Sequence, residues 1–317
     1  MIYQNATAAP REELQDFIQE GVTDFTMFQG LAVAPPMPLT LVTGHVPKIT
    51  IAKGDLLRAS QRQRAPGTNF TRWQAAIEAH SITLLQIAEE EQIPDEQEML
   101  YEDYFDIEAW GANEATNRLK RGHEIEVAAA VENTNNFSAT GAGVAYTVAN
   151  LATIQFVNDV LQAIRTIKAR GEVANTLIIP GPVWDVIRQS TDVKSFIAGS
   201  INPSAIVNQD NMQKAFERNG ITQVLVPDAY VNQSEPLAND TINAIWAKTY
   251  VAVLTCKAGA LRGGGWGRTF FWDKQGPLFQ LYSYRDEKVA SNVIRSRKTS
   301  LVDATNTRAG QLITTSA

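Results

Sequence analysis

The side chains that could carry catalysis are few and scattered in this sequence. His45, His80 and His123 are the only histidines, and none has a second ligand nearby at a metal-binding spacing. We therefore expect structural or surface roles for them instead of a zinc site or a general base. Cys256 is the single cysteine, so no intrachain disulfide can form, and its apolar neighbours predict a buried thiol.

Two glycine-rich segments resemble phosphate-binding loops only superficially. Gly263-Gly264-Gly265-Trp266-Gly267 lacks the Lys-Ser or Lys-Thr pair that would contact a phosphate and Mg²⁺. Thr140-Gly141-Ala142-Gly143 follows a predicted helix, not a strand, and lacks the third glycine of a dinucleotide fingerprint. A serine-nucleophile elbow is also missing. The sequence thus predicts no catalytic residue and no cofactor, and a protein that is not an enzyme.

Charged residues, in contrast, gather in two neighbouring segments. Arginines crowd around the turn signal Ala65-Pro66-Gly67: Arg58, Arg62, Arg64 and Arg72. An acidic stretch follows: Glu89, Glu90, Glu91, Asp95, Glu96, Glu98, Glu102, Asp103, Asp106 and Glu108. A calcium loop alternates its ligands around a fixed glycine, and this stretch has neither feature, so no metal site is predicted.

The arginine segment has two interpretations. It could be a solvated loop, or it could bind carboxylates, which guanidinium groups contact in a two-pronged geometry. Its length favours a functional loop over a simple connection. We therefore predict that the arginines reach a carboxylate-rich partner surface. Its candidate residues are Glu89, Glu90, Glu91, Asp95 and Glu96.

The composition bounds the remaining classes of function. The chain has 317 residues, 44% of them hydrophobic, which suggests roughly two domains with real cores. Its formal net charge of −6 argues against wrapping nucleic acid tightly, because that requires clustered Lys and Arg. The start lacks signal-peptide features, and no apolar run could span a bilayer, so a cytosolic protein without membrane contact is expected.

Periodicity divides the chain into four stretches. Residues 1–40 hold one short helical pattern (Leu14, Phe17, Ile18) and end in a proline cluster that favours an extended arm. Residues 41–92 resemble a long two-stranded hairpin with the arginines near its tip. A long helix is predicted over 106–132, with an apolar face consisting of Ile107, Trp110, Ala115, Leu119, Val127 and Val131. Gly111 and Gly122 weaken it slightly.

The fourth stretch predicts a compact α/β unit. An amphipathic helix ends at Gly171, the buried strand Thr176-Leu177-Ile178-Ile179 follows, and further helices begin near Pro182 and Asn211. A long strand is predicted over 242–254. The tail from Phe270 is mostly β in character and is expected to pack under the long helix, so the α/β unit would be an insertion between two parts of one domain.

The order of these parts resembles one protein family, the tailed-phage major capsid proteins of the Hong Kong 97-like fold. The residues that carry the likeness are Gly54-Asp55, Arg62 through Arg64-Ala65-Pro66-Gly67, Phe70-Thr71-Arg72, Glu89-Glu90-Glu91, Ile93-Pro94-Asp95-Glu96, Arg118-Leu119 to Glu124, Val127-Ala128, Ala174 through Ile179, and Val183-Trp184. The match covers the chain from about Gly44 to its end.

The resemblance implies an α+β fold with four parts. These are an N-terminal arm (1–40), an E-loop hairpin (41–92), a peripheral domain (93–145 and 251–317) with a spine helix at about 106–132, and an axial domain (146–250). It also implies that the E-loop lies over a neighbouring subunit. Lys53 is the only lysine near the loop tip, and no local signature assigns it a covalent link, so a non-covalent shell is expected.

The implied function is a major capsid protein. Pentamers and hexamers of the chain would form the icosahedral or prolate head around double-stranded DNA, which the inner face would contact weakly and without sequence preference. The implied location is the virion, after assembly in the host bacterial cytoplasm, with portal, scaffolding and decoration or cement proteins as partners. Scaffolding would be a separate protein or unnecessary, because the arm is short. The alternative is an encapsulin-type nanocompartment shell that encloses an enzyme cargo.

Overall fold

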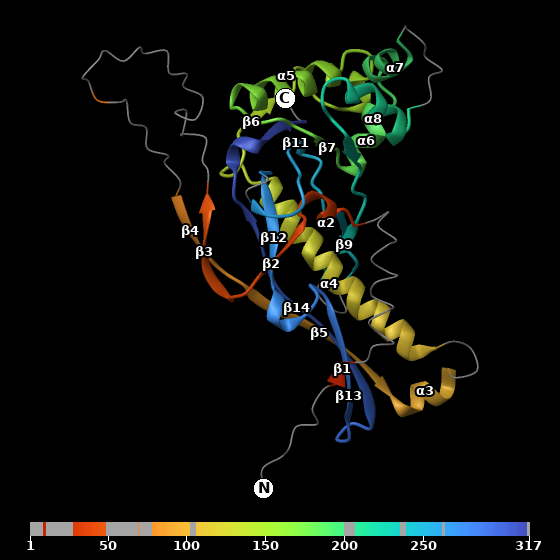
Figure 1. The fold of residues 1–317 in the computed structure, drawn as a ribbon. Helices are drawn as coiled ribbons and strands as arrows, with labels where there is room; N and C mark the ends of the chain where they lie inside the picture. The colour runs from red at the N-terminus through yellow and green to blue at the C-terminus, as the bar shows by residue number, and fades with distance from the viewer. Residues whose placement is uncertain are drawn as a thin grey trace.

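Two β-sheets and one long helix organise the described part of the chain (Figure 1). The computed structural model describes residues 9–10, 28–48, 69, 78–101, 106–199, 207–234, 239–261 and 264–315. The helical pattern predicted around Leu14 and the turn predicted at Ala65-Pro66-Gly67 lie outside the described residues.

The predicted long helix is α4, Ile107–Val131, which crosses the molecule diagonally in Figure 1. Its 25 residues span about 37 Å at 1.5 Å per residue. At its start, the Asp106 carboxylate accepts a hydrogen bond from Ala109 N at 3.0 Å and satisfies a donor that would otherwise be free. The helix therefore begins where an N-cap residue stands in the sequence.

The close packing around Gly111 explains why α4 contains a glycine at this position. A Cβ at this position would lie 3.0 Å from Ile93 Cδ1, so glycine lets the helix approach the sheet closely. The prediction that Trp110 belongs to the buried face is wrong, because its side chain is 52% exposed. Adjacent helical residues are rotated by about 100°, so a helix that turns Gly111 to the sheet turns Trp110 away.

The larger sheet, called the peripheral sheet here, packs against α4. Its strands are β1 (Ala9–Pro10), β2 (Pro36–Leu39), β5 (Leu85–Pro94), β12 (Gly267–Trp272), β13 (Gln280–Asp286) and β14 (Ser291–Ala304). β14 is central and pairs antiparallel with β5, β12 and β13. Ile93, Leu119 and Ile294 fill one core between this sheet and α4. The β-rich tail thus packs against the long helix, as predicted.

A hairpin of β3 (Thr43–Lys48) and β4 (Glu78–Thr83) projects from one side of the molecule (Figure 1). Leu84 alone separates β4 from β5, so the two strands form one long run from the hairpin into the peripheral sheet. The proline cluster is extended, as predicted, since β2 pairs in parallel with β12. The short α2 (Gly30–Val33) precedes it.

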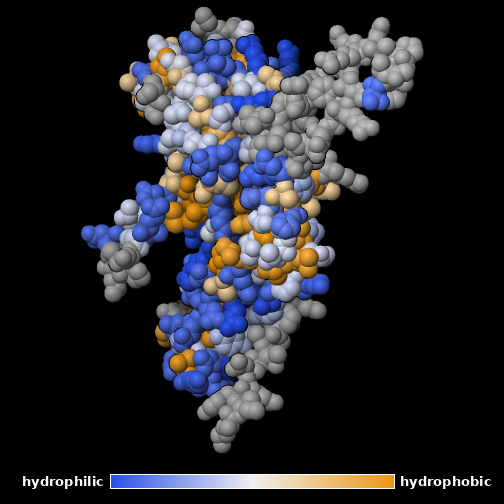
Figure 2. Space-filling view, turned by 90° about the vertical axis from the view of Figure 1, so that its left-hand side faces the viewer, coloured by the Kyte–Doolittle hydropathy of each residue, from blue (hydrophilic) through white to orange (hydrophobic). Residues whose placement is uncertain are grey.

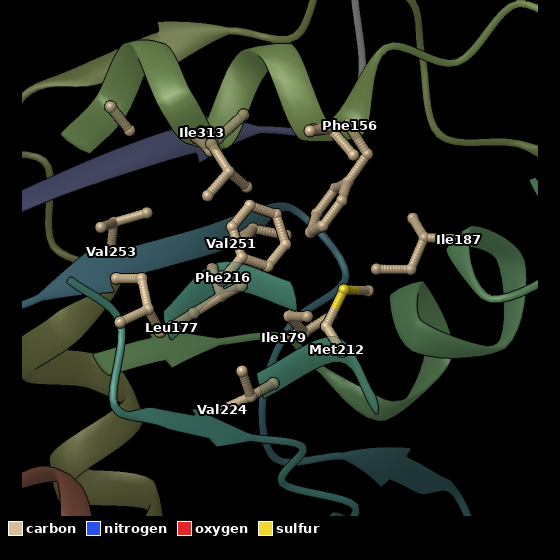
Figure 3. Packing of buried hydrophobic residues seen from close by; sticks show 14 of the residues in the cluster. Phe156, Leu177, Ile179, Ile187, Met212, Phe216, Val224, Val251, Val253 and Ile313 are labelled. Atoms are coloured by element: carbon tan, nitrogen blue, oxygen red, sulfur yellow. The ribbon is translucent and has the colours of Figure 1, made fainter. Parts of the chain in front are cut away.

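The second sheet, called the axial sheet here, has the strand order β6-β15-β11-β7-β8. Its strands are β6 (Ala139–Gly141), β7 (Thr176–Ile178), β8 (Gln223–Leu225), β11 (Tyr250–Leu254) and β15 (Gly310–Thr314). The helices around it are α5 (Phe156–Ala169), α6 (Gly181–Ile187), α7 (Thr191–Ala198) and α8 (Gln209–Glu217). Figure 3 shows their shared core, in which Phe156, Phe216 and Val251 converge.

The helices of this unit follow the predicted pattern closely. α5 buries an apolar stripe that includes Val160, Ile164 and Ile167, and it ends just before Gly171, which has φ +83°. The sheet itself extends beyond the expected axial range 146–250, because β11 and β15 are two of its inner strands. Strands from the C-terminal part of the chain therefore connect the two halves of the molecule.

The prediction of one long strand over 242–254 is wrong. It is divided into β10 (Ile242–Ala244), which pairs with β9 (Tyr230–Asn232), and β11, which belongs to the axial sheet. Trp246 lies at the break, and its buried indole turns to α4, where it donates to Glu124. A buried polar contact thus interrupts a run of residues whose local pattern favours one strand.

Candidate intersubunit surface

The hairpin base is the described part of the predicted arginine arm. Arg58, Arg62, Arg64 and Arg72 lie outside the described residues. At the base, Val46, Ile82 and Leu84 pack with Phe270 of the peripheral sheet. The hairpin therefore has a small apolar core of its own that connects it to the body.

The base also makes a polar contact with the peripheral sheet. His80 Nε2 on β4 lies 3.5 Å from Asp303 Oδ2 on β14. A second histidine, His45 on β3, is 3.0 Å from Ser81 Oγ across the hairpin. His80 thus has a partner in the peripheral sheet and His45 has one within the hairpin, and both contacts are structural.

The predicted acidic partners lie on β5 and at the start of α3 (Asp95–Tyr101). Three of them already have partners in their own chain. Glu90 is 2.5 Å from Arg295 Nε, Glu91 is 2.8 Å from Arg118 Nη1, and Asp95 contacts Arg285 through two bonds of 2.5 and 2.6 Å. The bidentate bond from Arg285 lowers the pKa of Asp95.

Glu89 and Glu96 differ from the other three, because both are exposed and neither forms an ion pair with another described residue. Sequence could not separate them from Glu90, Glu91 and Asp95, since the pairing depends on the antiparallel register that sets Glu90 opposite Arg295. Of the five predicted acidic partners, the structure therefore leaves only Glu89 and Glu96 without an ion pair to another described residue.

The described residues contain no group of three metal-ligating side chains. Burial lowers the pKa of His123 and raises the pKa of Cys256 to about 12, so the imidazole and the thiol stay neutral near pH 7. No helix in the described part of the chain is long and apolar enough to cross a membrane.

The glycine-rich segment is a structural turn closed by Arg268. This buried guanidinium donates to the carbonyl oxygens of Gly259, Gly264 and Gly267 at 3.2, 2.8 and 2.8 Å. Gly265 has φ +106°, and a Cβ there would lie 2.7 Å from Arg268 Nη1. In the described part of the segment, these carbonyl oxygens accept hydrogen bonds from the Arg268 guanidinium, which holds the turn in place.

Two buried charged groups, Glu124 on α4 and Lys298 on β14, were not predicted. Glu124 accepts hydrogen bonds from Trp246 Nε1 (2.6 Å), Gly30 N (2.6 Å) and Gln29 N (3.2 Å). Lys298, whose side chain is only 1% exposed, donates to Glu126 Oε2 at 2.9 Å. No local signal marks either residue, because their partners lie far away in the sequence.

Comparison with known proteins gives matches in structure only. No family model matches the chain, and no curated protein matches its sequence. A phage-related protein from Bordetella bronchiseptica RB50 has a TM-score of 0.71 at 15% identity, with 98% of each chain covered. The capsid of cyanophage P-SCSP1u has a TM-score of 0.55 at 12% identity, covering 99% of this chain and 90% of the other.

The name of a third matching structure does not mention a phage. A virus-like particle from Pyrococcus furiosus has a TM-score of 0.57 at 10% identity, covering 95% of this chain and 98% of the other. Together with the sheets, the hairpin and the long helix, these matches show that the chain shares the fold of these proteins. More particularly, the fold is the Hong Kong 97-like fold of phage capsid proteins.

Proposed function

We propose that the chain is the major capsid protein of a tailed phage, which assembles with copies of itself into a closed head around double-stranded DNA. The observation that carries this proposal is the full-length correspondence with a phage-related protein, 98% of each chain. Closed rings of five and six would let one repeated contact form a shell without open fibres.

Electron microscopy of the purified protein, together with light scattering, tests the proposal. The expected result is closed particles built from rings of five and six subunits. A protein that stays monomeric at high concentration in all salt and pH conditions would contradict it.

A nanocompartment shell is the second candidate. It would use the same fold, since the Pyrococcus furiosus virus-like particle is as similar in structure as the cyanophage capsid. Particles isolated from the native source separate the two functions. Nuclease-protected double-stranded DNA supports a phage head, whereas an enclosed enzyme without DNA supports a nanocompartment.

The net charge of −6 supports weak contact between the inner face and DNA. In a gel-shift assay at moderate salt, the isolated subunit should bind DNA weakly and without sequence preference. Sub-micromolar, sequence-selective binding would contradict this. Portal, scaffolding and decoration or cement proteins, a location in the virion and assembly in the host cytoplasm remain predictions from the resemblance.

The arginine arm is proposed as an intersubunit contact. Arg58, Arg62, Arg64 and Arg72 of one copy would approach the acidic surface of the next, where Glu89 and Glu96 have no ion pair within the described residues. Exposed ion pairs contribute only about 0–1 kcal/mol each, so the arginines would act as a set. Because the same contact is repeated around a closed shell, these small free energies add up.

Charge reversal of the set tests this contact. Changing all four arginines to glutamate should leave the circular dichroism of the subunit unchanged but abolish shell formation, although rings could still form. The matched control changes the same four residues to lysine, which keeps the charge. Normal shells from the glutamate variant would mean that the segment is a solvated loop.

A further inference from the structure

A hollow of about 550 Å³ lies between α7 and α8 in the axial unit. Ligand sites in proteins commonly have volumes of about 300–1,000 Å³, so this hollow has room for a small organic molecule and not only for a single inorganic ion. Among the described residues that line it there is no carboxylate. The hollow therefore favours a neutral or anionic ligand over a cation.

The floor of the hollow is apolar and partly aromatic. Phe196 and Ile197, near the end of α7, line it and are half-buried. The Phe196 ring packs on the buried ring of Phe216, with centroids 4.9 Å apart and an angle of 44° between the planes. Because Phe216 supports the ring from the core side, the exposed part of Phe196 is a fixed surface of the hollow.

This floor is separate from the larger apolar surface of the subunit. Figure 1 places α7 and α8 at the top of the molecule, and Figure 2 shows the largest apolar areas of its face at mid-height. The half-buried Phe196 and Ile197 are thus a local feature of the axial unit.

Two cations stand on the wall that α8 forms. Lys214 and Arg218 are four residues apart, so they lie on one face of the helix with Cβ atoms about 5–6 Å apart. Both side chains are exposed, and neither forms an ion pair or a hydrogen bond within the described part of the chain. On α6, in contrast, Arg188 contacts Asp185 at 2.9 Å. Like charges at this spacing repel each other, so an anion between Lys214 and Arg218 would remove an unfavourable interaction.

The position of Lys214 and Arg218 has a second explanation. Both stand at the C-terminal end of α8, where cations interact favourably with the helix dipole. That effect requires neither an aromatic floor nor amide groups, yet Asn211 and Asn219 also line the hollow. An aromatic ring, two cations and two amides in one hollow are the groups that bind the base and the phosphate of a nucleotide.

Charge and shape select this class of anion over others. A phosphate monoester carries a charge of about −1.5 to −2 at pH 7, which matches two cations, whereas a carboxylate carries only one charge. A planar base can stack on Phe196, and its polar edge can form hydrogen bonds with the amides of Asn211 and Asn219. The apolar chain of a fatty acid could form no such bonds. A nucleotide therefore matches all three kinds of group.

We infer that the hollow between α7 and α8 binds a nucleoside monophosphate, with the base on Phe196 and the phosphate between Lys214 and Arg218. A free nucleotide and the phosphorylated end of a nucleic-acid strand share this chemistry. The inference goes beyond the proposed capsid function and does not depend on it, because all the residues of the site belong to one subunit.

Equilibrium dialysis of the full-length protein with labelled AMP tests the inference. At saturation, one AMP should bind per subunit. Inorganic phosphate, which lacks the base, and adenosine, which lacks the phosphate, should each compete at least about tenfold more weakly than AMP. A phosphorylated oligonucleotide distinguishes the two sources: stronger competition than AMP identifies a strand end as the ligand, and equal or weaker competition identifies the free nucleotide.

Variants locate the bound nucleotide. The double variant Lys214→Ala with Arg218→Ala should bind AMP at least about tenfold more weakly, and it should stay folded because both side chains are exposed. The matched control, Arg165→Ala with Lys168→Ala, removes two exposed cations from α5 and should bind AMP as the wild type does. Phe196→Leu keeps the floor apolar but removes the ring, so AMP should bind several-fold more weakly while competition by inorganic phosphate stays the same.

Three results would overturn the inference. Equal loss of AMP binding in the two double variants would mean that only the overall charge attracts the nucleotide. Competition by inorganic phosphate as strong as that by AMP would mean that the base makes no contact. Absence of AMP binding to the folded wild type would mean that the hollow is not a nucleotide site. None of these results bears on shell assembly, which electron microscopy measures separately.

Discussion

Removing the Glu124 carboxylate should destabilise the subunit strongly. This side chain, which is buried on α4, accepts hydrogen bonds from Gly30 N, Gln29 N and Trp246 Nε1. In Glu124→Ala, the buried donors Gly30 N and Trp246 Nε1 and the half-buried Gln29 N lose their acceptor, and each unsatisfied buried donor costs about 1–3 kcal/mol. Burial raises the pKa of Glu124, because the charged carboxylate is less well solvated in the interior than in water. The alanine variant removes this desolvation cost, which offsets part of the loss in stability. The net loss should be about 3–4 kcal/mol.

Urea denaturation of the unassembled subunit at pH 7 measures this loss. Glu114→Ala is the matched control, because Glu114 lies on the same helix and makes a partly exposed ion pair with Arg118 at 3.3 Å. That pair should contribute less than about 1 kcal/mol. A Glu124→Ala variant that loses no more free energy of unfolding than the control would refute the reasoning.

Hydrogen exchange gives the structural test of the same prediction. The Gly30 amide should lose protection in Glu124→Ala, while amides in the centre of α4 keep theirs, because the carboxylate joins α2 to the helix. Unchanged protection at Gly30 would mean that another group holds this segment.

Two further changes test the interior. Burial raises the pKa of Glu132 to about 7, so it stabilises the protein fully below pH about 4.5 and progressively less as the pH rises to 7. Relative to Glu132→Gln, the wild type should therefore lose about 1–2 kcal/mol between pH 5 and 8, after allowance for partial exposure, and parallel stability profiles would contradict this. A Cβ in Gly310→Ala would lie 2.5 Å from Phe137, so thermal unfolding should show a loss of about 1–3 kcal/mol, whereas Gly141→Ala, with open space around it, should lose little.

Local patterns in the sequence determined the elements whose formation depends on residues that are close in the sequence. The apolar spacing of α5, the N-cap at Asp106 and the glycine after α5 fix helices through contacts a few residues apart. The same applies to the β character of the tail and to the separation of the arginine segment from the acidic stretch. These features can be predicted from the sequence because each depends on residues that are adjacent or a few positions apart.

The tertiary structure alone decided which charged groups are already occupied. Glu90, Glu91 and Asp95 look like Glu89 and Glu96 in sequence, but within the described part of the chain only the first three form an ion pair with an arginine, which lies on β14, α4 and β13 respectively. Likewise, a long-range bond from Trp246 to Glu124 divides a run of strand-forming residues. The bond from Trp246 to Glu124 and the pairs of Glu90 with Arg295 and of Asp95 with Arg285 join residues more than a hundred positions apart, and local periodicity carries no information about contacts at that separation.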